Sequence, residues 1–137
     1  MADLNERRGL IDTSLVIDLE RLAPEALPAE MAISAVTLAE LAAGPHATAD
    51  ASERARRQDR LQRVEATFDA LPFDASAARA YGRVYAEVAA AGRKARGRRA
   101  VDLLIAATAL AGALPLYTRN PSDFDGLDAL IEVTVVP

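Results

Sequence analysis

The chain has 137 residues, of which 51% are hydrophobic and only 4% aromatic, and its formal net charge is −4. This length fits one domain, which we expect to cover residues 1–137 with a core that needs no crosslinks. The absence of cysteine excludes disulfides, a thiol nucleophile and a thiolate metal site, and it suits a reducing cytoplasm.

Alternating strands and helices are predicted along the chain. Short apolar runs bounded by turn residues predict strands, and apolar residues repeated every three or four positions predict helices. In chain order we expect a strand at 9–11, a helix at 15–22, a strand at 31–33, helices at 36–43 and 49–70, a strand at 71–73, a helix from an Asp74 or Ser76 cap to Gly92, a helix at 101–111, and strands at 114–117 and 131–136. This alternation is typical of an α/β fold with a mainly parallel sheet and helices on both faces.

Proline and glycine set several of these boundaries. Pro24 ends the first helix, and the Gly44-Pro45 pair ends the second. Pro72 marks the strand at 71–73 as an edge strand, because proline has no backbone N–H to donate.

No segment predicts secretion or membrane insertion. Residues 1–12 carry charges where a secretory leader would have its apolar stretch. The longest mostly apolar run, residues 101–116, contains Asp102 and Pro115 and is too short to span a bilayer. We therefore expect a soluble, cytoplasmic protein that has no membrane partner.

Four acidic residues are candidates for a site, and three of them, Asp12, Glu40 and Asp123, lie where an expected strand leads into a helix or turn. Asp12 directly follows the first strand, and Glu40 lies early in the helix after the second strand. Asp102 is expected in the first turn of the helix at 101–111, and Asp123 follows the strand that ends near residue 117. Because ligands of open α/β sheets bind outside the carboxyl ends of the strands, these four side chains are expected to converge.

Each of these acids also has a purely structural interpretation. Asp12 suits a helix N-cap, and Glu40 completes a Thr37-x-x-Glu40 pattern that resembles a capping box. Asp102 would complement a helix dipole, and Asp123 would suit a turn. None of these interpretations explains why all four acids fall at one end of the sheet.

Clustered carboxylates repel each other and raise each other's pKa, and a divalent cation removes that penalty. Oxygen-only ligands favour Mg²⁺ or Mn²⁺. Such an ion binds a phosphate oxygen and activates water, so the acids predict metal-assisted hydrolysis of a phosphodiester.

Basic residues are concentrated in two segments. One is a predicted loop that contains Arg93, Lys94, Arg96, Arg98 and Arg99, and the other contains Arg54, Arg56, Arg57, Arg60 and Arg63. Either segment is compatible with an ordinary solvated surface. Because the first precedes Asp102, it also predicts a phosphate-binding surface beside an acidic metal site.

Four segments together resemble the PIN-domain nucleases. They are Leu10-Ile11-Asp12-Thr13-Ser14, Ser34-Ala-Val-Thr37-Leu-Ala-Glu40-Leu, Val101-Asp102-Leu-Leu-Ile-Ala-Ala-Thr108-Ala and Thr118-Arg119-Asn120-Pro-Ser-Asp123-Phe124. Their order and spacing agree with that family over nearly the whole chain. As a small single-domain form, the chain is similar to VapC-type toxins of toxin–antitoxin pairs.

The resemblance implies a three-layer PIN-like fold with about five strands, an Mg²⁺- or Mn²⁺-dependent endoribonuclease, a homodimer and inhibition by a small cognate antitoxin. It implies that Asp12, Glu40 and Asp102 bind metal and carry catalysis, with Asp123 as the fourth acid and Asp125 as its competitor. The polar residues beside these acids are Thr13, Ser14, Thr118 and Asn120. The antitoxin surface is expected on helices that carry Leu38, Leu41, Tyr81 and Tyr85.

Three alternatives remain open at this point. A receiver-like binding module would need a lysine after a late strand, whereas Lys94 is the only lysine and lies in the basic loop. A haloacid-dehalogenase-like phosphatase would need Asp-x-Asp, whereas Asp12 is followed by Thr13-Ser14. The third is a PIN-like fold without catalytic activity. The single histidine, His46, matches no family segment and is expected to be an exposed loop residue.

Overall fold

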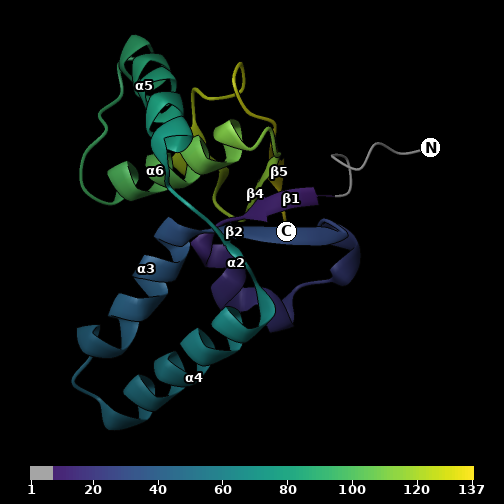
Figure 1. Cartoon of the computed structure of the whole chain (residues 1–137), viewed down its shortest axis with the longest axis vertical. Coiled ribbons are helices and arrows are strands. Elements are labelled where there is room, and N and C mark those ends of the chain that lie inside the picture. Colours follow the sequence, from purple (N-terminus) through teal and green to yellow (C-terminus); the bar gives the residue numbers. More distant parts are fainter. Residues whose placement is uncertain (1–7) are drawn as a thin grey trace.

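A computed structural model of the chain describes residues 8–137 and shows a five-stranded sheet with helices on both faces (Figure 1). Part of the argument against a secretory leader rests on residues 1–7, which lie outside the described residues. The elements are β1 (Arg8–Ile11), α2 (Thr13–Asp18), β2 (Glu30–Ser34), α3 (Ala35–Ala43), α4 (Ala51–Thr67), β3 (Ala70–Leu71), α5 (Ala75–Ala90), α6 (Arg98–Ala111), β4 (Leu116–Thr118) and β5 (Val133–Val135). None of the helices within 8–137 is long and apolar enough to cross a membrane.

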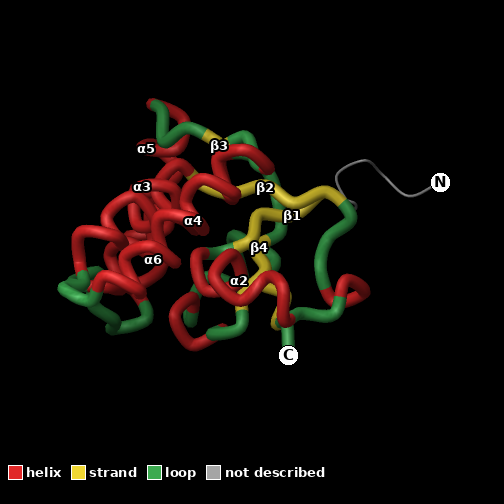
Figure 2. Tube along the Cα trace, turned by 90° about the horizontal axis from the view of Figure 1, so that it is seen from below, coloured by secondary structure: helices red, strands yellow, loops and turns green. Residues whose placement is uncertain are grey.

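All strand pairs are parallel, and the strand order is β3-β2-β1-β4-β5. Figure 2 shows the strands following one another from β3 through β2 and β1 to β4. β1 is the central strand, with β2 on one side and β4 on the other. The chain adds β2 and then β3 on one side of β1 and afterwards β4 and β5 on its other side, so the strand order reverses beside β1. This order differs from the 2-1-3-4-5 order of receiver domains, so the receiver-like alternative is wrong.

Neighbouring residues of each central strand point into two different cores. Leu10 and Ala32 belong to the core that α5 and α6 cover. Ile11 and Ile33 belong to the second core, which contains residues of α2, α3 and α4. This division follows from the period of two in a strand, and it explains why both faces of the sheet are apolar.

Several element boundaries differ from those expected from the sequence. Helix α6 begins at Arg98 rather than at residue 101, so Arg98 and Arg99 are helical rather than part of the basic loop. The edge strand β3 ends at Leu71, before Pro72, which confirms the edge position and shifts the strand toward the N-terminus. His46 is exposed, as expected, and lies in a 3₁₀ turn after α3.

Gly9 tests the packing of the central strand. A Cβ at Gly9 would lie 2.5 Å from a ring carbon of Tyr117 and 3.0 Å from Cβ of Pro28. We expect Gly9→Ala to lower the free energy of unfolding by about 1–3 kcal/mol, because this overpacking displaces the partly buried ring of Tyr117. The matched control is Gly82→Ala in α5, where nothing lies within 4 Å of the added carbon. The control should gain up to about 1 kcal/mol from helix propensity. Urea denaturation measures both, and a Gly9→Ala protein as stable as wild type would contradict the packing described.

Candidate active site

Asp12 is a buried carboxylate at the end of β1, with 5% of its surface exposed. Its Oδ1 accepts hydrogen bonds from the Leu15 backbone N–H at 3.0 Å and from the Ser14 hydroxyl at 2.7 Å. Its Oδ2 accepts from the Thr118 hydroxyl. Asp12 therefore caps α2, as the structural interpretation expected, and it is also fixed from β4 across the sheet.

The hydroxyl of Thr118 has one proton, and its direction can be assigned. The backbone N–H of Asn120 donates to Thr118 Oγ1 at 2.9 Å, so the oxygen is the acceptor there and its proton is free for Asp12. Asn120 thus contributes its backbone rather than its side chain to this network. Three donors fix the two carboxylate oxygens of Asp12, and they come from α2 and β4.

Glu40 is fixed by the residue that follows Asp12. The Thr13 hydroxyl donates to Glu40 Oε1 at 2.6 Å and lies 3.0 Å from the hydroxyl of Thr37. The N-cap of α3 is Ser34, whose hydroxyl accepts from the Val36 N–H at 3.0 Å. The capping-box interpretation of Glu40 is therefore wrong, because Thr37 is not the cap and Glu40 lies beyond the first turn.

Asp102 lies in the second turn of α6 rather than the first, because the helix begins at Arg98. The helix-dipole interpretation is weakened accordingly. Burial, together with the negative charges of Asp123, Glu40 and Asp12, raises the pKa of Asp102 to about 6, although the nearby positive charge of Arg98 acts in the opposite direction. The four predicted acids are thus close enough to act electrostatically on one another.

The structure separates Asp123 from its competitor Asp125. Asp123 belongs to a 3₁₀ turn at Pro121–Phe124, which the fully buried ring of Phe124 anchors in the core. Asp125 forms an ion pair with Arg93 at 3.2 Å, and it does not contribute to the raised pKa of Asp102. The charge of Asp123, and not that of Asp125, is therefore among those that raise the pKa of Asp102.

The donor chemistry of this cluster fits a hard divalent cation. Its ligands would be carboxylate oxygens, and the pKa of Asp102 is raised first by burial and then by the negative charges of Asp123 and Glu40, which a bound cation would offset. Within residues 8–137, no three acidic or histidine side chains surround a single point closely enough to hold a metal ion as they stand. Binding therefore requires side-chain rotation, for which the partly exposed Asp102 and Asp123 are better placed than buried Asp12.

Sequence reasoning missed a buried hydroxyl pair behind the acids. Thr108 Oγ1 donates to the Leu104 carbonyl at 3.0 Å, so at its 3.0 Å contact with Ser34 the Ser34 hydroxyl is the donor. Both residues are buried, and they join the start of α3 to α6. Ser34 and Thr108 belong to the second and third of the four segments that resemble the PIN-domain nucleases, and this position could have marked them as part of the site.

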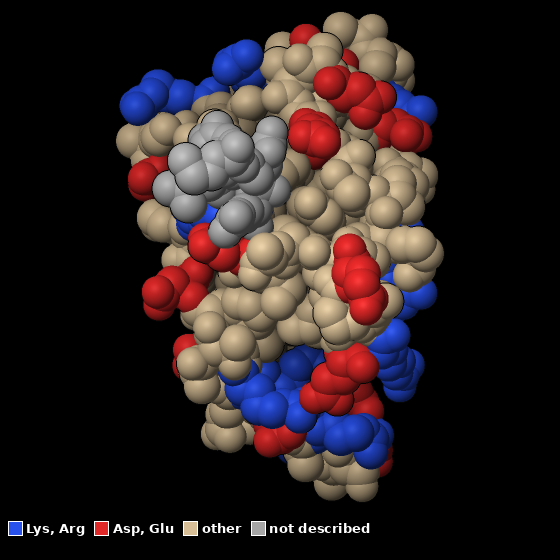
Figure 3. Space-filling view, turned by 90° about the vertical axis from the view of Figure 1, so that its right-hand side faces the viewer, with Lys and Arg blue, Asp and Glu red and all other residues tan. Residues whose placement is uncertain are grey.

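The two basic segments differ in how they are neutralised. On α4, Arg54 bonds backbone carbonyls, Arg56 and Arg57 pair with Glu53, and Arg63 pairs with Glu20 and Asp59. Figure 3 shows such mixing of basic and acidic residues at the α4 end of one face of the molecule. In the other segment, Lys94 and Arg96 are exposed and form no ion pair within residues 8–137, and Arg98 lies beside Asp102. Arg99 is half-buried, and its Nη1 has no partner among the described residues.

Comparison with known proteins assigns the chain to a family. Residues 10–130 match the PIN domain, so the chain belongs to the PIN-domain family. Ribonuclease VapC5 of Mycobacterium tuberculosis is 40% identical to it over 93% of each chain, and Ribonuclease VapC of Rickettsia bellii is 32% identical over 93% of this chain and 96% of that one. A crystal structure of VapBC-5 from M. tuberculosis, a member of the VapBC family of toxin-antitoxin systems, matches with a TM-score of 0.80 and 38% identity, covering 95% of this chain and 98% of that one. Both of these curated relatives of the chain are thus VapC ribonucleases.

The raised pKa of Asp102 predicts a pH-dependent cost to the metal-free fold. Between the ordinary value of 3.8 and about 6, the folded state binds more protons than the unfolded state, so stability falls as the pH rises through this window. Asp102→Asn should therefore stabilise the metal-free protein above pH 6, and the gain should vanish toward pH 4. Two pKa units correspond to about 3 kcal/mol, and partial exposure of the side chain reduces this to about 1 kcal/mol.

Thermal unfolding in EDTA between pH 4 and 8 measures this difference. The control is Asp128→Asn, at an exposed acid outside the cluster, which should change stability little at any of these pH values. An Asp102→Asn protein that is less stable than wild type at pH 8 would show that the carboxylate is stabilising and would contradict the repulsion inferred here.

Proposed function

We propose that this protein is a divalent-metal-dependent endoribonuclease and the toxin of a toxin–antitoxin pair. The observation that carries the proposal is the convergence of Asp12, Glu40, Asp102 and Asp123 beside the point where strand order reverses. The similarity to Ribonuclease VapC5 and to a VapBC toxin-antitoxin structure supports the substrate and the biological role.

The four carboxylates have different positions and therefore different proposed roles. Asp12 and Asp102, with their neighbours, would hold Mg²⁺ or Mn²⁺, which lowers the pKa of bound water and neutralises charge on the scissile phosphate. Thr118 and Ser14 hold Asp12 in a single orientation. Glu40 and Asp123 are the candidates for orienting or deprotonating the attacking water, because either carboxylate can accept a proton.

RNA is proposed to approach over the basic segment before α6. Arg93, Lys94, Arg96 and Arg98 precede Asp102, so phosphates that flank the scissile bond would meet positive charge. The half-buried Arg99 is the least accessible of the five predicted RNA-binding residues. We also propose the homodimer that the family resemblance implies. A PIN-like fold without activity remains the alternative, and RNA cleavage by the purified protein distinguishes the two.

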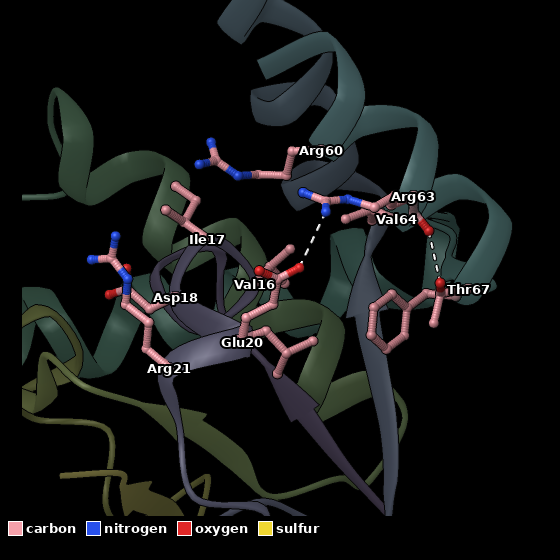
Figure 4. Close-up of a pocket in the computed structure, with 11 residues that line it drawn as sticks. Val16, Ile17, Asp18, Glu20, Arg21, Arg60, Arg63, Val64 and Thr67 are labelled. Atoms are coloured by element: carbon pink, nitrogen blue, oxygen red, sulfur yellow. Dashed lines mark hydrogen bonds and ion pairs between the residues drawn. The ribbon is translucent and has the colours of Figure 1, made fainter. Parts of the chain in front are cut away.

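The proposed antitoxin site is a groove between α2 and α4 that is lined by both apolar and charged residues. Its volume is about 490 Å³, and Val16, Val64 and Phe68 are among the apolar residues that line it (Figure 4). Glu20 and Arg63 form an ion pair at 3.1 Å that bridges the two walls. Ile17 is 45% exposed on one wall, which is unusual for so large an apolar side chain and suits a protein partner.

This groove continues toward the active site. Ile17 and Arg60 also line a second cleft of about 340 Å³, which contains Thr13, Glu40 and Arg98. A peptide in the first groove can therefore extend a cationic side chain, preferably arginine, to Glu40 and Asp12. Of the residues expected from the sequence to carry the antitoxin surface, Leu41 also lines this second cleft, whereas Tyr85 lies on α5, on the opposite face of the sheet.

Substitution of the acids tests the catalytic proposal. Asp12→Asn, Glu40→Gln and Asp102→Asn should each lower the rate of Mg²⁺-dependent RNA cleavage by about 100-fold or more, with unchanged circular dichroism. Asp123→Asn should lower the rate strongly, whereas Asp125→Asn, which removes only the ion pair with Arg93, should keep most activity. Wild-type cleavage by Asp12→Asn or Asp102→Asn would refute the site.

Competition tests the antitoxin proposal. Mg²⁺ should weaken antitoxin binding to the wild-type protein much more than to Asp12→Asn, at matched ionic strength, because antitoxin cation and metal would occupy the same carboxylates. Calorimetric titration of antitoxin into each protein gives both affinities. Equal sensitivity to Mg²⁺ would instead place the inhibitory contact outside the metal site.

A further inference from the structure

A small hollow lies beside the C-terminal half of α5, on the opposite face of the sheet from the antitoxin groove. Its volume is about 180 Å³, and its lining includes Tyr85, Ala89, Arg93, Lys94 and Arg96. This volume is below the roughly 300–1,000 Å³ of sites for small-molecule ligands. The hollow therefore suits a single flat group that belongs to a larger ligand.

Tyr85 gives this hollow an exposed aromatic surface. Its side chain is 52% exposed, and it lies one helical turn after Tyr81. The two ring centroids are 6.3 Å apart with an angle of 49° between the rings, and Tyr81 packs against the core. Tyr85 thus has a supporting ring beside it and remains accessible to a ligand. An aromatic ring in this position provides a stacking surface for any nucleobase.

The charges around Tyr85 define which ligand fits. Lys94 and Arg96 are exposed and make no ion pair or side-chain hydrogen bond with any residue in 8–137. Arg93 pairs with Asp125 at 3.2 Å, which leaves the other two cations to attract an anion. A flat aromatic group joined to a phosphate matches this combination, and an unpaired nucleotide in an RNA strand is such a ligand.

The hollow is connected to the acidic cluster at both ends of the basic segment. At one end, Arg93 pairs with Asp125, two residues after Asp123, and a Cβ at Gly126 would lie 3.4 Å from that of Ala91. At the other end, Gly97, with φ of +60°, turns the chain into α6, where Arg98 acts on Asp102. An RNA strand that follows these cations passes from Tyr85 to the carboxylates.

We propose that Tyr85, Lys94 and Arg96 bind one unpaired nucleotide of the RNA substrate, with its base stacked on Tyr85 and its phosphate on the two cations. The proposal rests on the proposed ribonuclease function and specifies its substrate. Because a paired base has no free face to offer Tyr85, the site selects a strand that is unpaired at this position.

Binding measurements separate the aromatic contribution from the ionic one. The background is Asp102→Asn in EDTA, and the probe is a fluorescein-labelled 12-nucleotide RNA of mixed sequence, single-stranded or annealed to its complement. Tyr85→Ala should weaken binding of the single strand by about 5- to 100-fold and leave the salt dependence unchanged. Lys94→Ala and Arg96→Ala should each reduce the slope of log K against log salt by about 0.7. The duplex should bind more weakly, and Tyr85→Ala should not affect it.

Tyr85→Phe is the matched control, because it keeps the ring and removes the hydroxyl. The chain has no tryptophan and three tyrosines, so tyrosine emission reports on the stacking directly. Unlabelled single-stranded RNA should quench this emission in the Asp102→Asn background. Tyr85→Phe should lose most of the quenching and keep the affinity, a result that a merely structural role for Tyr85 would not produce.

Several outcomes would overturn this proposal. Unchanged affinity of Tyr85→Ala for the single strand, or equal binding of duplex and single strand, would do so. A change in oligomeric state or in antitoxin affinity with unchanged RNA affinity would assign Tyr85 to a protein interface. RNA cleavage is measured in parallel with the active-site acids intact, with and without Tyr85→Ala. If RNA is cleaved and Tyr85→Ala has no effect, only the nucleotide site is refuted. If the protein neither cleaves nor binds RNA, the ribonuclease function is refuted as well.

Discussion

The hydrogen bond from Thr118 to Asp12 links the ends of β4 and β1, and the geometry of the acidic cluster depends on it. A buried carboxylate costs several kcal/mol unless donors satisfy it. Asp12 finds its donors on the helix that it caps and on the neighbouring strand, so neither element can shift without exposing an unsatisfied charge. This constraint fixes the start of α2, and hence Thr13, which in turn holds Glu40.

Hydroxyl groups rather than cations orient this cluster. Ser14, Thr13 and Thr118 bond the carboxylates, and the Ser34–Thr108 pair joins α3 to α6 behind them. Hydroxyls fix orientation without supplying positive charge, so the repulsion from the other acids persists and adds to burial in raising the pKa of Asp102. A site held by arginines would be stable without a ligand, whereas this one retains negative charge that a divalent cation can neutralise.

The sequence predicted the parallel sheet and the strand ends where the acids lie, because buried strands and the residues after them are local patterns. It misplaced the start of α6, because the N-cap there is Gly97, which offers no side-chain cap to recognise. The strand order, which excludes a receiver, depends on packing between distant segments and has no local signal. Tyr81 and Tyr85 share one helical face, and only the fold distinguishes the ring that packs from the ring that is exposed.

The two faces of the sheet differ in how their basic side chains are paired, and they therefore favour different kinds of ligand. On α4 most of the positive charge is neutralised by partners within the molecule, and the groove there offers apolar surface. On the α5–α6 face, Lys94 and Arg96 are unpaired within residues 8–137 and lie beside an exposed aromatic ring. A protein segment that binds through apolar contacts is therefore favoured on the first face, and a polyanion on the second. On the proposed assignments, antitoxin and RNA approach from opposite faces of the sheet and compete where both reach the carboxylates and Arg98, which lines the cleft beside Glu40. Inhibition then depends on this shared region and not on covering Lys94 and Arg96.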